Sequence, residues 1–252
     1  QPSITTTTTL TREATPTIEG IAEAGSTVEL FNGDVSLGTT TADETTGAYT
    51  ITPAALSDGD YSLTVTATDA AGNISAASDA LSMTVDATAP AQPSITTTTT
   101  LTREATPTIS GTAEAGSTVT LLSSGVEIGT ITADESGEFS ITTPTLADSN
   151  YVLTVTATDA AGNISAASSE LNLTVDTTAP GKPSIITTTT LTNDATPTIE
   201  GIAEAGSTVT LFVDGVTTGI TTTADGTTGA FSITVPEQSD GTYALTVTAA
   251  DA

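Results

Sequence analysis

The residues in this sequence with the greatest capacity for chemistry are carboxylates that return at the same places along the chain. Asp and Glu number 30 against three Lys and Arg, and His and Cys are absent. Calcium prefers such oxygen ligands and takes six to eight of them. Short turns and linkers hold the candidate ligands, which are Glu23, Asp69, Asn73, Asp86, Glu114, Asp134, Asp159, Asn163, Asp176, Glu204 and Asp251. The sequence therefore predicts calcium as the bound cofactor.

The residue types exclude most other chemistry. Without His and Cys the chain has no Ser-His-Asp triad, no thiol nucleophile and no zinc or haem site. Its only lysine is Lys182, so two of the three repeats described below lack the lysine of a Lys–Asn isopeptide crosslink. Aromatic residues make up 3% of the chain, and no aromatic-lined pair of carboxylates for glycoside hydrolysis is indicated. We expect no enzyme activity.

The net charge of −27 is spread along the whole chain. Residues 1–90 carry 12 acidic residues and one basic residue, residues 91–180 carry ten and one, and residues 181–252 carry eight and one. Such a chain repels nucleic acid and anionic membrane surfaces and attracts divalent cations. No apolar run approaches 18 residues, so we expect no membrane insertion.

Internal repeats define the organisation of the chain. Residues 1–18 recur unchanged at 92–109 and, with edits, at 182–199. The segment TVTATDAAGNISAAS at residues 64–78 recurs at 154–168. We therefore predict three domains at residues 1–90, 91–180 and 181–252, and expect the third to lack its last strand.

Each repeat shows the alternation of apolar and polar residues that is typical of half-buried strands. In the first repeat this pattern predicts strands from residue 3 and at 15–22, 26–31, 35–42, 48–52, 61–68 and 74–85. About seven short strands in 90 residues indicate an all-β fold of tandem immunoglobulin-like β-sandwich domains arranged end to end. One tyrosine per repeat opens the sixth strand, where such sandwiches place a corner tyrosine: Tyr61, Tyr151 and Tyr243.

Sandwich topology predicts which carboxylates meet. The turns at EAGS, ADESG and DAAGN should lie at the end where the chain enters each domain. Asp86, in the linker that leaves the first repeat, should therefore face Glu114, Asp134, Asp159 and Asn163 of the second. The corresponding set at the second junction is Asp176, Glu204 and Asp251. Asp, Asn and Gly also favour turns in their own right, so a purely structural role for these residues stays open.

The order of segments TPTIxGxAEAGSTVxL, TADxxGxFSI, TVTATDAAGNxSAAS and TVDxTAP resembles the bacterial Ig-like repeats of giant surface adhesins. The resemblance covers the whole chain. It implies a stalk segment on the extracellular side of a bacterial cell surface, with neighbouring repeats as partners, calcium at the domain junctions and an unknown distal ligand. Two alternatives stay open, a module that binds a glycan or host protein and a strand-exchanging filament subunit.

Overall fold

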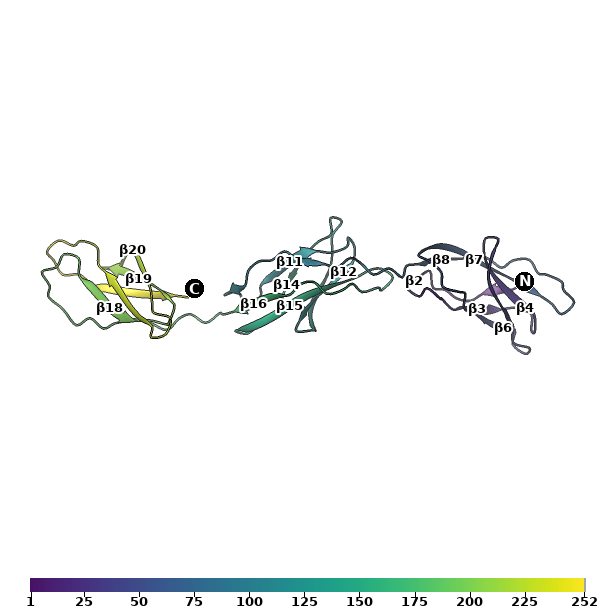
Figure 1. Ribbon diagram of the computed structural model, residues 1–252, viewed down its shortest axis with the longest axis horizontal. Helices are drawn as coiled ribbons and strands as arrows, with labels where there is room; N and C mark the ends of the chain where they lie inside the picture. Colours follow the sequence, from purple (N-terminus) through teal and green to yellow (C-terminus); the bar gives the residue numbers. More distant parts are fainter. Residues whose placement is uncertain (252) are drawn as a thin grey trace. The chain divides into compact units, whose positions relative to one another are not determined.

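The computed structural model describes residues 1–251, which form strands and no helix. The chain divides into two compact units, Gln1–Asp176 and Thr177–Ala252. The first unit holds two sandwiches and the second unit holds one (Figure 1). The predicted all-β class is confirmed.

Each sandwich consists of two sheets. In the first repeat, a three-stranded sheet has the order β1 (Ser3–Ile4), β3 (Ile18–Ile21), β6 (Ala48–Ile51). The opposing five-stranded sheet has the order β2 (Leu10–Thr11), β8 (Leu81–Val85), β7 (Gly59–Thr68), β4 (Thr27–Asn32), β5 (Val35–Thr41). All pairs are antiparallel except β2 with β8.

The second repeat forms the same two sheets. The three-stranded sheet has the order β9 (Ser94–Ile95), β11 (Thr108–Thr112), β14 (Glu138–Thr142). The five-stranded sheet has the order β10 (Leu101–Thr102), β16 (Leu171–Val175), β15 (Ser149–Thr158), β12 (Thr118–Ser123), β13 (Val126–Thr132). The third repeat has two three-stranded sheets, β17 (Ser184–Ile185), β18 (Thr198–Ile202), β21 (Ala230–Thr234) and β20 (Val216–Thr223), β19 (Thr208–Val213), β22 (Leu245–Ala250).

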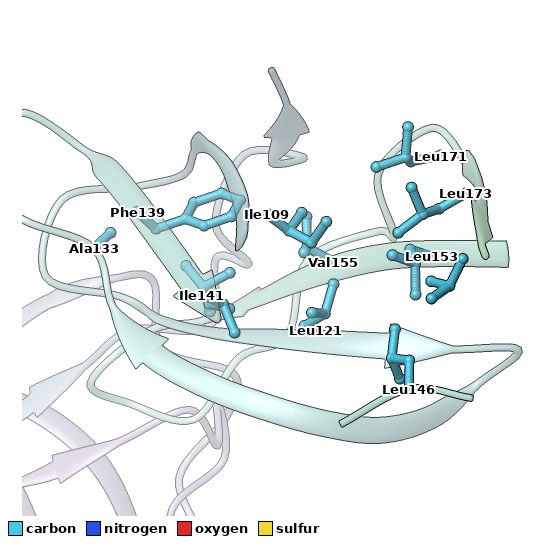
Figure 2. Packing of buried hydrophobic residues seen from close by; sticks show 12 residues of the cluster. Ile109, Leu121, Ala133, Phe139, Ile141, Leu146, Leu153, Val155, Leu171 and Leu173 are labelled. Carbon is cyan, nitrogen blue, oxygen red and sulfur yellow. The ribbon is translucent and has the colours of Figure 1, made fainter. Parts of the chain in front are cut away.

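The core of each sandwich lies between its two sheets and consists of the alternate residues that point inward. In the second repeat, Ile109 and Phe139 come from one sheet and Leu121 and Leu153 from the other (Figure 2). Ile109, Leu121 and Leu153 are fully buried. The outward residues of the same strands are mostly threonines, whose β-branched side chains favour strands without requiring burial.

The first predicted strand is wrong in one respect, because it is divided between the two sheets. Residues 3–4 pair with β3, whereas residues 10–11 pair in parallel with β8 of the other sheet. The threonine run at residues 5–9 is not a strand but the connection between them. Thr6 Oγ1 accepts a hydrogen bond from the Glu19 backbone N–H at 2.8 Å, which ties this connection to β3.

The last predicted strand, 74–85, is too long. Strand β8 begins at Leu81, and Ile74 makes only an isolated bridge to Thr68. Two serines replace the ladder along this edge of β7. Ser75 Oγ accepts from the Ala67 backbone N–H at 3.0 Å, and Ser78 Oγ accepts from the Val65 N–H at 3.1 Å. These hydroxyls satisfy the N–H groups that a longer strand would have paired.

The corner tyrosines adopt the predicted arrangement. The hydroxyl of Tyr61 donates to the backbone oxygen of Ser57 at 2.7 Å. Tyr151 donates to Ala147 at 3.0 Å and Tyr243 to Ser239 at 3.0 Å in the same way. Each tyrosine therefore fixes the turn that leads into its strand, which favours a structural role over carbohydrate stacking.

Within residues 1–251, the third sandwich has no strand that corresponds to β8 and β16 of the first two. Within the described residues β22 pairs only with β19, and Leu245 and Val247 are half-buried where their counterparts Leu63 and Val65 are fully buried. Residue 252 corresponds to Ala160, so appending the sequence of residues 161–177 after it should cover this edge and raise the melting temperature of the third domain. Calorimetry measures the change, and an unchanged melting temperature would contradict the pairing.

Candidate functional site

The turn at residues 159–163 of the second repeat is built by Asp159. Its Oδ1 accepts a hydrogen bond from the Asn163 backbone N–H at 2.9 Å, and its Oδ2 accepts from Asn163 Nδ2 at 2.8 Å. Gly162 has φ of +92°, a conformation that glycine adopts without strain. Desolvation raises the pKa of Asp159, but the hydrogen bonds from Asn163, Gly162 and Ala161 outweigh it and lower the pKa.

Asn163 also joins the first two domains. Its Nδ2 donates to the backbone oxygen of Asp86 at 2.7 Å, so one amide group bridges oxygens of the linker and of the turn. Asn163 is 8% exposed, whereas Asn73, at the same position of the first repeat, is exposed. The structure thus brings together three of the predicted site residues, Asp86, Asp159 and Asn163.

A second contact between the first two domains comes from a residue that the sequence analysis missed. We call the region of these two contacts, where Arg12 meets Gly162 and Asn163 meets Asp86, the joint. Arg12, in the turn after β2, donates from Nη1 to the backbone oxygen of Gly162 at 2.6 Å. Arg12 and Arg103 occupy the same position in their repeats and are two of the three basic residues of the chain. The sequence did contain a signal for this contact. A basic residue that recurs at the same turn is unexpected in so acidic a sequence and could have indicated a role for Arg12.

The linker itself is held by Asp58, a second residue outside the predicted set. The Asp58 carboxylate accepts a hydrogen bond from the Ala87 backbone N–H at 2.8 Å and another from the Thr88 hydroxyl. These bonds, led by that of Thr88, lower the pKa of Asp58 below 3.8. Asp58 fixes the first residues of the linker beyond Asp86.

The lowered pKa of Asp58 gives this contact a predictable pH dependence. A carboxylate with a depressed pKa in the folded state contributes stability above its unfolded pKa and loses it as pH falls through the folded value. The change in the chemical shift and exchange protection of the Ala87 amide should therefore have its midpoint below the ordinary pKa of an aspartate carboxyl. A pH titration followed by NMR measures this, with Asp58→Ala as the control that lacks the transition. An amide whose transition has its midpoint at or above the ordinary pKa of aspartate would contradict the contact.

The remaining candidate ligands of the first two repeats serve their own turns. Asp134 Oδ1 accepts from the backbone N–H and hydroxyl of Ser136 and from the Glu138 N–H, at 2.7–2.9 Å, and its pKa is lowered, chiefly by the Ser136 hydroxyl. The backbone oxygens of Glu23 and Glu114 each accept from the serine three residues later. Asp69 and Asn73 form the same turn as Asp159 and Asn163.

The residues predicted at the second junction belong to separate units, Asp176 to the first and Glu204 and Asp251 to the second. The Asp176 backbone N–H donates to the Thr102 oxygen at 2.9 Å, which continues the pairing of β10 with β16. In the second unit, Glu204 Oε2 accepts from the Gly181 backbone N–H at 3.2 Å. Asp251 directly follows β22.

The residues at the joint do not form a calcium cage in this arrangement. Calcium needs six to eight oxygens directed at one point. Both Asp159 oxygens and the Asp86 carbonyl instead accept N–H groups of Asn163, whose amide nitrogen donates to oxygens of both domains. Residues 1–251 contain no group of three or more Asp and Glu side chains that could hold a metal. Calcium binding stays a prediction.

A comparison with protein families identifies the family of these domains. A family model described as "Bacterial Ig-like domain" matches residues 3–87, 90–177 and 184–252. The chain belongs to the bacterial Ig-like domain family. The predicted resemblance to bacterial Ig-like repeats is thereby confirmed, and so is the fold of tandem Ig-like domains. This family is typically non-enzymatic, and the lack of enzyme activity in this chain stays an expectation.

The chain is similar to several solved structures, one of which has a TM-score above 0.5. A marsupial T cell receptor, 10% identical, is covered in full and covers all of this chain with a TM-score of 0.54. The fibronectin(III)-like modules of Clostridium thermocellum CbhA are 20% identical, with 69% of this chain and 94% of theirs covered and a TM-score of 0.46. The BSP domain of a biofilm-associated protein is 22% identical, with 71% and 30% covered and a TM-score of 0.29.

The likeness to the T cell receptor supports the Ig-like fold alone. No curated protein matches the chain. Residues 1–251 include no helix with the length and hydrophobicity that a membrane crossing requires.

Proposed function

We propose that this chain is a segment of the stalk of a bacterial cell-surface adhesin, a spacer located outside the cell. Its tandem domains resemble adhesin modules. The observation that supports the proposal is that the residues of the joint recur at the same positions in successive repeats. These residues are Arg12 and Arg103, Asp58 and Asp148, Asn73 and Asn163, and Asp86 and Asp176.

Repetition of the joint residues matters because a stalk must present the same contact to each neighbour. In the first unit the linker is bound on both sides, by Asp58 of the domain it leaves and by Asn163 of the domain it approaches. Links of this kind restrict rotation between domains that a free linker would allow. In this function the partners of each domain are its neighbours in the same chain.

A module that binds a glycan or host protein is the main competing function. Binding loops usually differ between neighbouring modules, whereas spacers repeat them. The EAGS turn is identical in all three repeats, at residues 23–26, 114–117 and 204–207, which favours the spacer. A strand-exchanging filament would use the exposed edge of β22, and pairing with a second chain would then be visible as concentration-dependent association.

Surface display separates these functions. The chain is placed between a cell-surface anchor and an epitope tag, and variants with residues 91–180 duplicated or deleted serve as the comparison. A spacer should move the tag farther from the cell with each added domain, which super-resolution microscopy measures. Capture of glycans or host proteins by the chain itself, together with an unchanged tag height, would contradict the proposal.

A further inference from the structure

We infer that the joint between the first two domains is held by nitrogen donors of the chain itself and keeps its orientation without a divalent cation. The inference concerns the joint alone and holds whether the chain serves as a spacer or as a binding module. Arg12 is assigned as a positioning residue of this joint.

The contacts across the joint are of one chemical kind. In each, a side-chain N–H of one domain meets a backbone oxygen of the other, from Arg12 to Gly162 at 2.6 Å and from Asn163 to Asp86 at 2.7 Å. The donors come from opposite sides, one from the first domain and one from the second. Two contacts that run in opposite directions restrict both bending and twisting at the linker.

Charge explains why a guanidinium is suited to this place. Residues 1–90 carry a net charge of −11 and residues 91–180 a net charge of −9, so the two domains repel each other. A permanent positive charge at their contact reduces this repulsion, which is the effect expected of a bound calcium ion. The short distance between Arg12 Nη1 and the Gly162 oxygen is typical of charge-assisted hydrogen bonds.

Asn163 places an N–H donor on two of the oxygens that a cation at this joint would use. Its amide donates to the Asp86 carbonyl and to Asp159 Oδ2, so both acceptors already have a donor. The burial of Asn163 to 8% exposure, against an exposed Asn73 in the same turn of the first repeat, shows that this amide is enclosed by the joint. The turn itself is the same in both repeats, so the joint is what distinguishes the two residues.

The third repeat supplies the test substitution. It has Asn193 where the others have Arg12 and Arg103, and its sandwich forms with asparagine there. Arg12→Asn should therefore leave the first domain folded. Arg103→Asn is the matched control, because it makes the same change on the same turn of the second domain, away from this joint.

Spin labels measure the orientation directly, since the chain has no cysteine of its own. Cysteines replace Thr50 and Ser140, two exposed residues at the same position of the first and second domains. Electron–electron double resonance then gives the distance distribution in chelator and in calcium. We expect a narrow distribution in both solutions for the parent chain and for Arg103→Asn, and loss of the narrow distribution in both for Arg12→Asn.

Two outcomes would overturn the inference. One is a parent chain whose distribution is narrow only in calcium, which would make the ion the element that orders the joint. The other is an Arg12→Asn variant with the distribution of the parent chain in chelator. Circular dichroism of the same samples verifies that each variant is folded.

Discussion

Replacing Gly111 with alanine is expected to destabilise the second domain by about 3 kcal/mol or more, the upper range for overpacked cores. A Cβ atom on Gly111 would lie 2.1 Å from the Ser94 backbone oxygen and 2.4 Å from Cζ of Phe139. Phe139 is 4% exposed, and the Ser94 oxygen belongs to β9, the neighbouring strand. Neither group can move without opening the three-stranded sheet, so we expect a large loss of stability in chemical denaturation.

A matched glycine controls for the general effect of the substitution. At Gly226 an added Cβ meets nothing within 4 Å and the backbone φ is not positive. Gly226→Ala should be neutral or stabilising by about 0.4–1 kcal/mol, because alanine restricts the unfolded chain. Equal denaturation midpoints for Gly111→Ala and the parent chain would show that the aromatic ring does not pack over Gly111 as described.

Asn163→Ala should lower the stability of the second domain by about 1–3 kcal/mol, the usual cost of leaving buried polar groups without partners. The change removes the Nδ2 donor from both Asp86 and Asp159. Asn73→Ala is the matched control, because Asn73 makes the same bond within its turn and is exposed. The difference between the two variants in differential scanning calorimetry isolates the contribution of the joint. Equal effects would remove the joint contact from the account.

Asp86→Ala separates hydrogen bonding from calcium binding. The acceptor of Asn163 is the main-chain oxygen of Asp86, which every residue carries, so in chelator this substitution should leave the melting temperature close to that of the parent chain. If calcium binds the Asp86 carboxylate, the parent chain gains about 2.7 kcal/mol at a hundredfold excess of the ion over its dissociation constant, and Asp86→Ala loses that gain. A calorimetric titration with calcium therefore decides the calcium prediction.

The features that could be predicted from the sequence are those set by neighbouring residues. Strand alternation and the corner hydrogen bond of Tyr61 each depend on a few positions close in the chain. The parallel pairing of β2 with β8 could not be predicted, because it joins residues 10–11 to residues 84–85 and leaves no local pattern. Ser75 and Ser78 were likewise read as strand because serine fits a turn or an exposed strand position equally well.

The candidate site could be predicted in part from the expected sandwich topology. Topology placed Asp86 beside Asp159 and Asn163, and the structure brings these residues together. The contact with Asn163 is made by the main-chain oxygen of Asp86, and calcium binding by its carboxylate stays a prediction. Arg12 was missed because its acceptor is a backbone carbonyl, which any residue provides and no sequence motif records. Hydrogen bonds from a side chain of one domain to the backbone of another can therefore be identified only in a three-dimensional structure.

Small-angle X-ray scattering of the full chain tests the spacer proposal most directly. The longest strands, β7 and β15, have 10 residues each. At about 3.3 Å per residue such a strand spans roughly 33 Å, so three domains with their linkers in a stalk should exceed ~100 Å in maximum dimension. The radius of gyration should then lie near 30 Å in calcium and in chelator alike, about that of a thin rod of this length. A value near 18 Å, as expected of one compact globule of about 250 residues, would contradict the account.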